Sequence, residues 1–455
     1  MDWDTLLTDF RIGREPEKQY ERKPHRPPWQ TDFDRITFSS AFRRLQDKTQ
    51  VFPLSSSDYV RTRLTHSMEV SAVGKSLGSL VGFFIRDEKK ALGNTHPLEV
   101  GQIVSAATLA HDIGNPPFGH SGENSIRGWF KNSKTVDEYR GQFSDNECSD
   151  FENYEGNAQG FRVLARLQMY RDSGGMQLTA ATLAAFAKYP AQSPPANGKR
   201  KYDGASTKKF GFFQSDQDLF KLVANRTGLI AREAEPNCWC RHPLAFVVEA
   251  ADDICYRIVD LEDGFRQKLI SYKRVEELIA SVLNDQSKMD RIAREDDEDT
   301  KVDIMRSIAI GCAIDEVAIA FDSNYAAIMA GTFDKPLLSD RSRLFHAFEA
   351  IKGEQKSTVY KNHRVLRVEA TGFRVIAGLL EPFTRAVFDC VKFGENAPPE
   401  SAKLFELIPT QFIGKDRKPH PNPYECILRI VDFICGMTDS YALELYRNIS
   451  GISVP

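Results

Sequence analysis

The stretches Arg63-Leu-Thr-His66-Ser-Met-Glu69 and Leu109-Ala-His111-Asp112-Ile-Gly114-Asn-Pro-Pro-Phe-Gly-His120-Ser-Gly-Glu123 contain three of the nine histidines of the chain. His66 and His111 lie in apolar patterns that are typical of helices. The segment from Gly114 to Gly122 is rich in glycine and proline, which predicts a loop. His111 and Asp112 therefore lie at a helix end, where both side chains can converge on one ion. His66, from a neighbouring helix, could supply a third ligand.

A fourth ligand is expected from Glu249-Ala-Ala-Asp252-Asp253, which lies within a helix predicted over residues 244–261. Carboxylates in an apolar helix are costly unless they are paired or bound to a metal ion. Spacing alone does not choose between Asp252 and Asp253. A mixed His and Asp set suits Mn, Fe, Co, Ni or Mg and argues against a closed thiolate zinc site. A single buried His is more often an ordinary core residue, but the combined pattern predicts a metal centre.

The composition excludes several classes of protein. Lys and Arg number 60 and Asp and Glu 63, so the net charge of −3 excludes a broadly basic protein that coats nucleic acid. No apolar run approaches the roughly 18 residues of a membrane span, and the first residues do not resemble a signal peptide. The eight cysteines form no CxxC pair. We therefore expect a cytoplasmic protein with reduced thiols and no membrane contact.

The chain is expected to be mainly α, because strand-like alternation is rare. The polar residues 1–34 are expected to form an extended arm, and the segment 190–207, rich in Pro, Gly and Ser, a mobile insertion. We expect a helical core over residues 35–270 and a second helical region over 271–455. The clearest helices are predicted at 64–84, 100–111, 157–170, 178–188, 244–261 and 423–446.

From about residue 35 to 450 the chain resembles the deoxyguanosine triphosphate triphosphohydrolase family of the HD superfamily of metal-dependent phosphohydrolases. This resemblance implies an almost entirely α fold around a five-helix HD core, and a hexamer built as a trimer of dimers. The matching motifs are Lys48-Thr-Gln50-Val-Phe-Pro-Leu, Arg61-Thr-Arg63-Leu-Thr-His66-Ser-Met-Glu-Val, His111-Asp-Ile-Gly-Asn-Pro-Pro-Phe-Gly-His120, Phe151-Glu-Asn-Tyr-Glu-Gly-Asn157-Ala-Gln-Gly, Lys188-Tyr189-Pro, Ala250-Ala-Asp-Asp-Ile-Cys-Tyr256, Asp260-Leu-Glu-Asp-Gly and Gly436-Met-Thr-Asp-Ser-Tyr-Ala.

The resemblance implies hydrolysis of a deoxynucleoside triphosphate, with dGTP as the expected substrate, at the α-phosphorus. The products are the deoxynucleoside and inorganic triphosphate. The implied ligands of a divalent metal ion, Mn²⁺ or Mg²⁺ with Fe, Co or Ni as alternatives, are His66, His111, Asp112 and Asp252; Asp253 is then structural. His120 is implied in proton transfer, with Glu123 orienting it. The alternative, purely structural roles are a loop hydrogen bond for His120 and a helix cap for Glu123.

Substrate contacts are also implied by the resemblance. Arg63, Lys188 and Lys209 match the cations that grip the polyphosphate. Glu369 matches a position that contacts guanine, whereas the stretch from Ala386 to Ser401 lacks the arginine that assists in guanine-selective members, so a broader deoxynucleotide range stays open. The implied sugar contacts are Gln50 and Asp260 at the 3′-hydroxyl, Asn157, Tyr189, and Tyr256 where a 2′-hydroxyl would collide.

Two further hypotheses stay open at this point. One is a different HD reaction, such as hydrolysis of a phosphomonoester or a cyclic nucleotide. The other is a nucleotide sensor or a single-stranded DNA-binding oligomer without catalysis. Single-stranded DNA is also expected as an effector of the enzyme, because some family members respond to it; the basic arm and Lys199-Arg-Lys201 could contact it.

Overall fold

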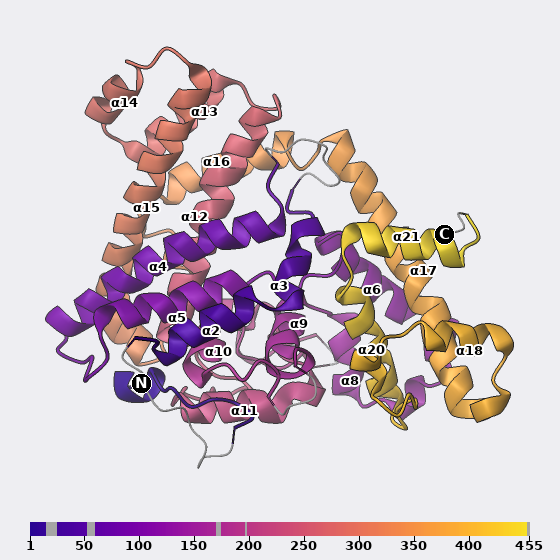
Figure 1. The fold of residues 1–455 in the computed structure, drawn as a ribbon. Helices are drawn as coiled ribbons and strands as arrows, with labels where there is room; N and C mark the ends of the chain where they lie inside the picture. Colours follow the sequence, from indigo (N-terminus) through magenta and orange to yellow (C-terminus); the bar gives the residue numbers. More distant parts are fainter. Residues whose placement is uncertain (15–24, 52–59, 170–173, 196–197, 453–455) are drawn as a thin grey trace.

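The computed structural model describes residues 1–14, 25–51, 60–169, 174–195 and 198–452. Its regular secondary structure is helical, with only isolated β-bridges among these residues, so the mainly α prediction is confirmed. The helices (Figure 1) are α1 (Trp3–Leu6), α2 (Pro28–Thr37), α3 (Ser40–Arg44), α4 (Arg63–Asp87), α5 (Pro97–Ala110), α6 (His120–Asn132), α7 (Lys134–Asp137), α8 (Asp145–Glu152), α9 (Gly156–Arg162), α10 (Ala180–Phe186), α11 (Gln217–Arg226), α12 (Pro243–Arg266), α13 (Tyr272–Leu283), α14 (Gln286–Ile292), α15 (Glu298–Met329), α16 (Phe345–Thr358), α17 (His363–Phe393), α18 (Pro399–Glu406), α19 (Thr410–Ile413), α20 (Pro423–Cys435) and α21 (Asp439–Ile449).

The helices α4 and α5 form the central pair of the fold. The first turn of α4 is fixed by a capping box in which Thr62 and Thr65 exchange side-chain hydrogen bonds. The two helices approach closely at Gly78, where a Cβ atom would lie 2.9 Å from the Cα of Gly101. This pair therefore places the start of α4, with His66, beside the end of α5, where His111 is the C-terminal cap.

The helix α4 has the length and apolar composition of a possible membrane span. It is the one described helix that is long and apolar enough to cross a membrane, although no such segment is expected from the sequence. Half of its apolar window is buried within the protein, and a buried core helix can have the same length and composition. Length and composition alone are therefore weak evidence for a membrane span.

The helix α12 packs against α4 and α5 and carries the acidic residues. It begins with Pro243 in the first turn, where a proline ring is well tolerated, and the His242 side chain accepts a hydrogen bond from the Leu244 amide. Its apolar residues are buried against both neighbours, so Asp252 is held next to the ends of α4 and α5.

The buried apolar residues form two clusters. The larger one contains side chains of α4, α5, α10, α12, α13 and α15, and the smaller one joins α6 and α8 to the C-terminal helices α17 and α20. In Figure 1, α13 to α16 extend at the upper left, whereas α17, α18, α20 and α21 lie on the right.

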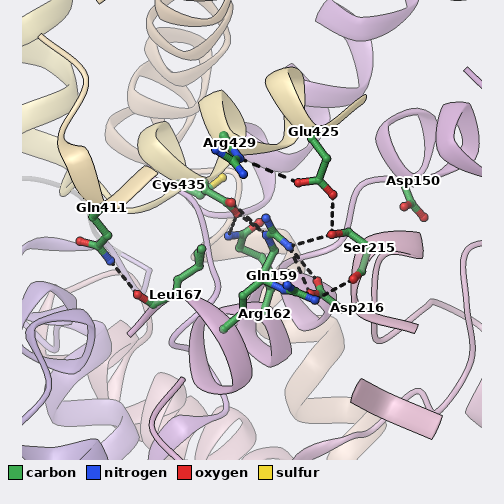
Figure 2. A network of polar contacts seen from close by, with 12 residues as sticks. Asp150, Gln159, Arg162, Leu167, Ser215, Asp216, Gln411, Glu425, Arg429 and Cys435 are labelled. Carbon is green, nitrogen blue, oxygen red and sulfur yellow. Dashed lines mark hydrogen bonds and ion pairs between the residues drawn. The ribbon is translucent and has the colours of Figure 1, made fainter. Parts of the chain in front are cut away.

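A buried ionic network joins α9 to the C-terminal helix α20 (Figure 2). The Arg162 guanidinium donates to Asp432 at 2.9 Å and to Asp216 at 3.1 Å. Gln159 also donates to Asp432, and Arg166 to Asp216. The network therefore fixes the C-terminal helices against the segments that approach the cavity described below.

Several expectations need correction. Residues 1–14 and 25–34 do not form an extended arm, because Trp3 is buried and Arg11 forms a buried ion pair with Asp32; residues 15–24 lie outside the described part. Instead of one helix over 423–446, α20 ends at Cys435 and the Thr438 side chain caps the start of α21.

The segment 190–207, expected to be mobile, is packed at both ends. Ala191 forms a bridge with Cys238, and the side chains of Ser193 and Ser206 are buried. Only its residues 196–197 lie outside the described part, as does the later half of the motif that begins at Lys48.

Candidate active site

The loop after α5 is shaped by close contacts with two other segments, α9 and the start of α4. A Cβ atom at Gly114 would lie 2.0 Å from the Gly160 amide nitrogen, so only glycine fits there. Gly119 has a φ of 56°, and a Cβ atom there would lie 2.9 Å from the Arg63 guanidinium. The chain then enters α6 with His120 at its first position.

The loop brings together the predicted metal ligands. Ligand atoms of His66, His111 and Asp112 all lie within 4.8 Å of one another. The Oδ1 atom of Asp252 lies 3.4 Å from Nε2 of His66 and 3.5 Å from Nε2 of His111. The start of α4, the end of α5 and the middle of α12 thus converge on one point.

These residues fit a divalent cation. Nδ1 of His111 lies 2.7 Å from the carbonyl oxygen of Thr108, which can only accept, so this nitrogen donates and Nε2 is the ring atom that can bind a cation. Nε2 faces Asp112 and Asp252 oxygens at 3.6 Å and 3.5 Å. Imidazole nitrogens and carboxylate oxygens are ligands of divalent cations, so His66, His111, Asp112 and Asp252 would hold such an ion.

Both carboxylates are held in the ionised form that a metal ion requires. Burial alone would raise the pKa of Asp112, but Arg63 and His111 lower that pKa to about 2. Burial also opposes ionisation of Asp252, yet His111 and His66 hold its pKa below the usual range. Arg63 donates to Asp112 Oδ2 at 2.6 Å, and Asn115 donates to Asp112 Oδ1.

His120 and Glu123 form a pair at the entrance to the cavity. Nδ1 of His120 lies 2.9 Å from Glu123 Oε2, and the His120 side chain is 82% exposed. Glu123 is buried and its other oxygen accepts from the Gly156 amide at 2.7 Å. Burial would raise the pKa of Glu123, but the His120 hydrogen bond and the nearby Lys209 lower it. This geometry supports a proton carrier oriented by a fixed carboxylate more than a helix cap.

A single cavity of about 660 Å³ contains nearly all of the predicted site residues. Asp260 is the exception: it is buried behind the wall, and its Oδ2 atom accepts from the Tyr360 hydroxyl at 3.0 Å. The predicted residues that line the cavity are Gln50, Arg63, His66, His111, Asp112, His120, Glu123, Asn157, Lys188, Tyr189, Lys209, Asp252, Tyr256 and Glu369.

The sugar and base side of the cavity has its own polar groups. Gln50 Oε1 is buried without a hydrogen-bond partner among the described residues, so it is free to accept from a hydroxyl. Tyr256 stacks on Tyr360 with a ring separation of 6.1 Å. Glu369 lines the cavity from α17. Arg385 falls within residues 385–405, where the family places an assisting arginine, but it pairs with Glu381 and does not line the cavity.

Sequence reasoning did not assign roles to Lys48, Tyr360 and Asp439. Lys48 is buried and donates to the carbonyl oxygens of Asn115 and Cys435 at 2.6 and 2.8 Å; burial lowers its pKa to about 8. Asp439 accepts from the Phe118 amide at 2.9 Å and from the Thr49 amide at 3.0 Å. Lys48 and Asp439 occur in motifs that carry the family resemblance. The sequence therefore marks both positions but does not indicate which groups their side chains contact. Tyr360 lies outside every such motif.

Comparisons with known proteins extend over the whole chain. No family model matches it. A deoxyguanosinetriphosphate triphosphohydrolase-like protein of Synechocystis sp. is 42% identical over 460 residues, and one of Pseudomonas aeruginosa is 38% identical over 464, each covering 100% of both chains. A deoxyguanosinetriphosphate triphosphohydrolase of Salmonella schwarzengrund is 30% identical over 93% of this chain and 94% of that protein. With such identity over full length, the chain belongs to the deoxyguanosinetriphosphate triphosphohydrolase family of hydrolases.

Proposed function

We propose that the protein hydrolyses deoxynucleoside triphosphates, dGTP above all, to the deoxynucleoside and inorganic triphosphate. The observation that carries the proposal is the convergence of His66, His111, Asp112 and Asp252 in the same cavity as the His120–Glu123 pair and the two lysines. Mn²⁺ or Mg²⁺ is the proposed ion, held by those four ligands. A bound divalent cation supplies Lewis-acid chemistry: it polarises a phosphoryl oxygen and lowers the pKa of water.

The remaining chemistry belongs to side chains of this chain. His120, held by Glu123, passes a proton between water and the leaving nucleoside oxygen. Arg63, Lys188 and Lys209 bind the polyphosphate and neutralise the charge that leaves with it. Together with the cation, they explain how a chain with a net charge of −3 can bind a tetra-anion.

The same proposal assigns substrate selection. Gln50 binds the 3′-hydroxyl, with Asn157 and Tyr189 beside the sugar, and Tyr256 fills the space that a 2′-hydroxyl would need. Asp260, which the sequence also suggested at the 3′-hydroxyl, lies behind the cavity wall and holds the Tyr360 hydroxyl instead. Glu369 accepts from N1 and N2 of guanine. Because Arg63 is the only arginine among the described residues that line the cavity, a broader deoxynucleotide range is the second candidate.

The decisive experiment incubates the protein with each of the four dNTPs and with GTP, in the presence of Mn²⁺. Chromatography then identifies the nucleoside products. Deoxyguanosine is expected to appear fastest, together with intact triphosphate, and Asp252→Ala or His111→Ala should abolish the activity. Release of phosphate or pyrophosphate instead would favour a different HD reaction. Retained turnover by metal-free Asp252→Ala protein would overturn the mechanism.

We also propose the assembly and the cellular context implied by the family. The protein forms a hexamer in the cytoplasm, with a core over residues 35–270 and the region 271–455 contributing Tyr360 and Glu369 to the cavity. Exposed apolar side chains on α17, Leu366 and Phe373, are candidates for oligomer contacts. Single-stranded DNA is proposed as an effector, although Arg200 of the basic segment 199–201 is turned inward onto Glu235.

A further inference from the structure

Both lysines assigned to the polyphosphate are ion-paired to buried glutamates. Nζ of Lys188 lies 3.3 Å from Glu249 Oε1, and Nζ of Lys209 lies 2.7 Å from Glu155 Oε2. The lysine side chains are 26% and 28% exposed and line the cavity. Each ammonium group therefore reaches the cavity from an anionic anchor in its wall.

Each of these glutamates is in turn held by an arginine that does not line the cavity. Arg241 Nη1 donates to Glu249 Oε2 at 2.7 Å, and Arg127 Nη2 donates to Glu155 Oε1 at 2.8 Å. The same order of arginine, glutamate and lysine thus occurs twice. It occurs on two different elements of the wall, because Glu249 lies on α12 and Glu155 immediately precedes α9.

At Glu249 the arginine makes further hydrogen bonds to the backbone. Arg241 is buried, and its Nε atom donates to the carbonyl oxygen of Lys188 at 2.8 Å. Its other terminal nitrogen donates to the carbonyl oxygen of Ala205 at 3.1 Å. Arg241 therefore fixes both the backbone of Lys188 and the carboxylate that faces the Lys188 ammonium.

This geometry has a consequence for ligand binding. A free lysine side chain loses much of its rotamer freedom when a phosphate immobilises it. A lysine already held by a carboxylate has lost part of that freedom before the ligand arrives. Burial would raise the pKa of Glu249, but Arg241 and Lys188 keep it below the usual range, so the anchor stays charged.

We propose that Glu249 is a positioning residue: its carboxylate, fixed by Arg241, holds the Lys188 ammonium where the substrate polyphosphate binds. Glu155, fixed by Arg127, does the same for Lys209. The inference rests on the proposed function, because it takes the polyphosphate as the ligand of both lysines. It requires Glu249 to act through Lys188 and not through the stability of α12.

A double-mutant cycle tests this requirement. The variants are Glu249→Gln, Lys188→Met and the two combined, and the probe is inorganic tripolyphosphate, whose affinity is measured by calorimetry without turnover. Glu249→Gln is expected to weaken binding and to raise KM for dGTP about tenfold, with kcat changed less than about twofold. The double variant should match Lys188→Met within about twofold.

Glu262→Gln is the matched control. Glu262 is a buried carboxylate on the same helix, paired with Arg61 at 2.8 Å and Arg306 at 2.7 Å, and it does not line the cavity. It should leave tripolyphosphate affinity unchanged. If Glu249→Gln does not fold, the cycle with Glu155→Gln and Lys209→Met, read by the same calorimetry, replaces it.

The outcomes separate the two proposals. Full additivity of Glu249→Gln and Lys188→Met, or unchanged tripolyphosphate affinity in Glu249→Gln, would overturn the positioning role. A wild-type protein that binds tripolyphosphate through Lys188 and Glu249 but releases no nucleoside from any dNTP would overturn the proposed function and leave the positioning role intact.

Discussion

Replacing Arg162 by methionine removes the only cation that bridges the buried carboxylates of Asp432 and Asp216 among the described residues (Figure 2). Arg162 is 3% exposed, and it donates from Nε to both oxygens of Asp432 at 2.9 Å. Without it, Asp216 keeps Arg166 as a partner, whereas Asp432 keeps only the Gln159 amide. One buried carboxylate is then left without a compensating charge.

Loss of one partner of a buried ion pair destabilises proteins by about 3–5 kcal/mol, and we expect Arg162→Met to fall in this range at pH 8. Burial raises the pKa of Asp432 above its usual value even with Arg162 beside it. Without Arg162 the carboxyl group should take up a proton more readily still. The loss of stability should therefore be smaller at pH 5.5 than at pH 8.

Guanidinium unfolding at both pH values, followed by far-ultraviolet circular dichroism, measures these differences. Adding Asp432→Leu to Arg162→Met removes the orphaned carboxylate and should recover much of the lost stability. Arg86→Met, at the exposed pair of Arg86 with Asp87, is the control and should change nothing measurable. If Arg162→Met unfolds at the same guanidinium concentration as Arg86→Met, the network does not stabilise the fold as argued.

Three further predictions concern pH and substrate selection. Burial raises the pKa of Asp150 from 3.8 to about 7, so its protonated form favours folding; this contribution is complete below pH 4 and is lost as the pH rises to 7. Asp150→Asn should therefore unfold at higher temperature than wild type at pH 8, by an amount that shrinks towards pH 4; an equal difference at both pH values contradicts the titration. Tyr256→Ala should open space for a 2′-hydroxyl and reduce the preference for dGTP over GTP, measured as a ratio of kcat/KM, at least about tenfold; an unchanged ratio means that Tyr256 does not exclude ribose. Glu369→Gln should lower the ratio of kcat/KM for dGTP over dATP about tenfold, since one acceptor for guanine is lost; the base contact is wrong if this ratio stays the same.

The sequence predicts the helices well because they depend on local patterns, and the residues predicted as metal ligands lie close together in the structure. The apolar repeats around His66 and His111 define α4 and α5, and the Gly-rich loop defines their junction. The choice of Asp252 over Asp253 came from family resemblance, since both lie in one helix. The break in 423–446 was missed, because the residues Gly436-Met-Thr438 continue an apolar pattern and only the cap at Thr438 ends it.

Contacts between segments that are distant in the chain cannot be predicted from the sequence alone. Nothing local indicates that Arg11 pairs with Asp32, so the polar composition of the N-terminal segment predicts an arm that the structure does not have. Tyr360 reaches Asp260 across 100 residues, and Arg241 reaches the Lys188 carbonyl across 53. Such partners follow from the packing of whole helices, which no window of sequence contains.

The hydrogen bonds of Asp439 have a consequence for how the protein folds during its synthesis. Its carboxylate holds the Phe118 amide across 321 residues and the Thr49 amide across 390. The loop between His111 and His120 is thus held by a residue that a growing chain does not yet contain when the loop has been made. A fragment that ends at residue 270 would keep all four proposed metal ligands but not the hydrogen bond from the Phe118 amide to Asp439. During synthesis, therefore, this loop is expected to take its final shape only after α21, which begins at Asp439, has docked.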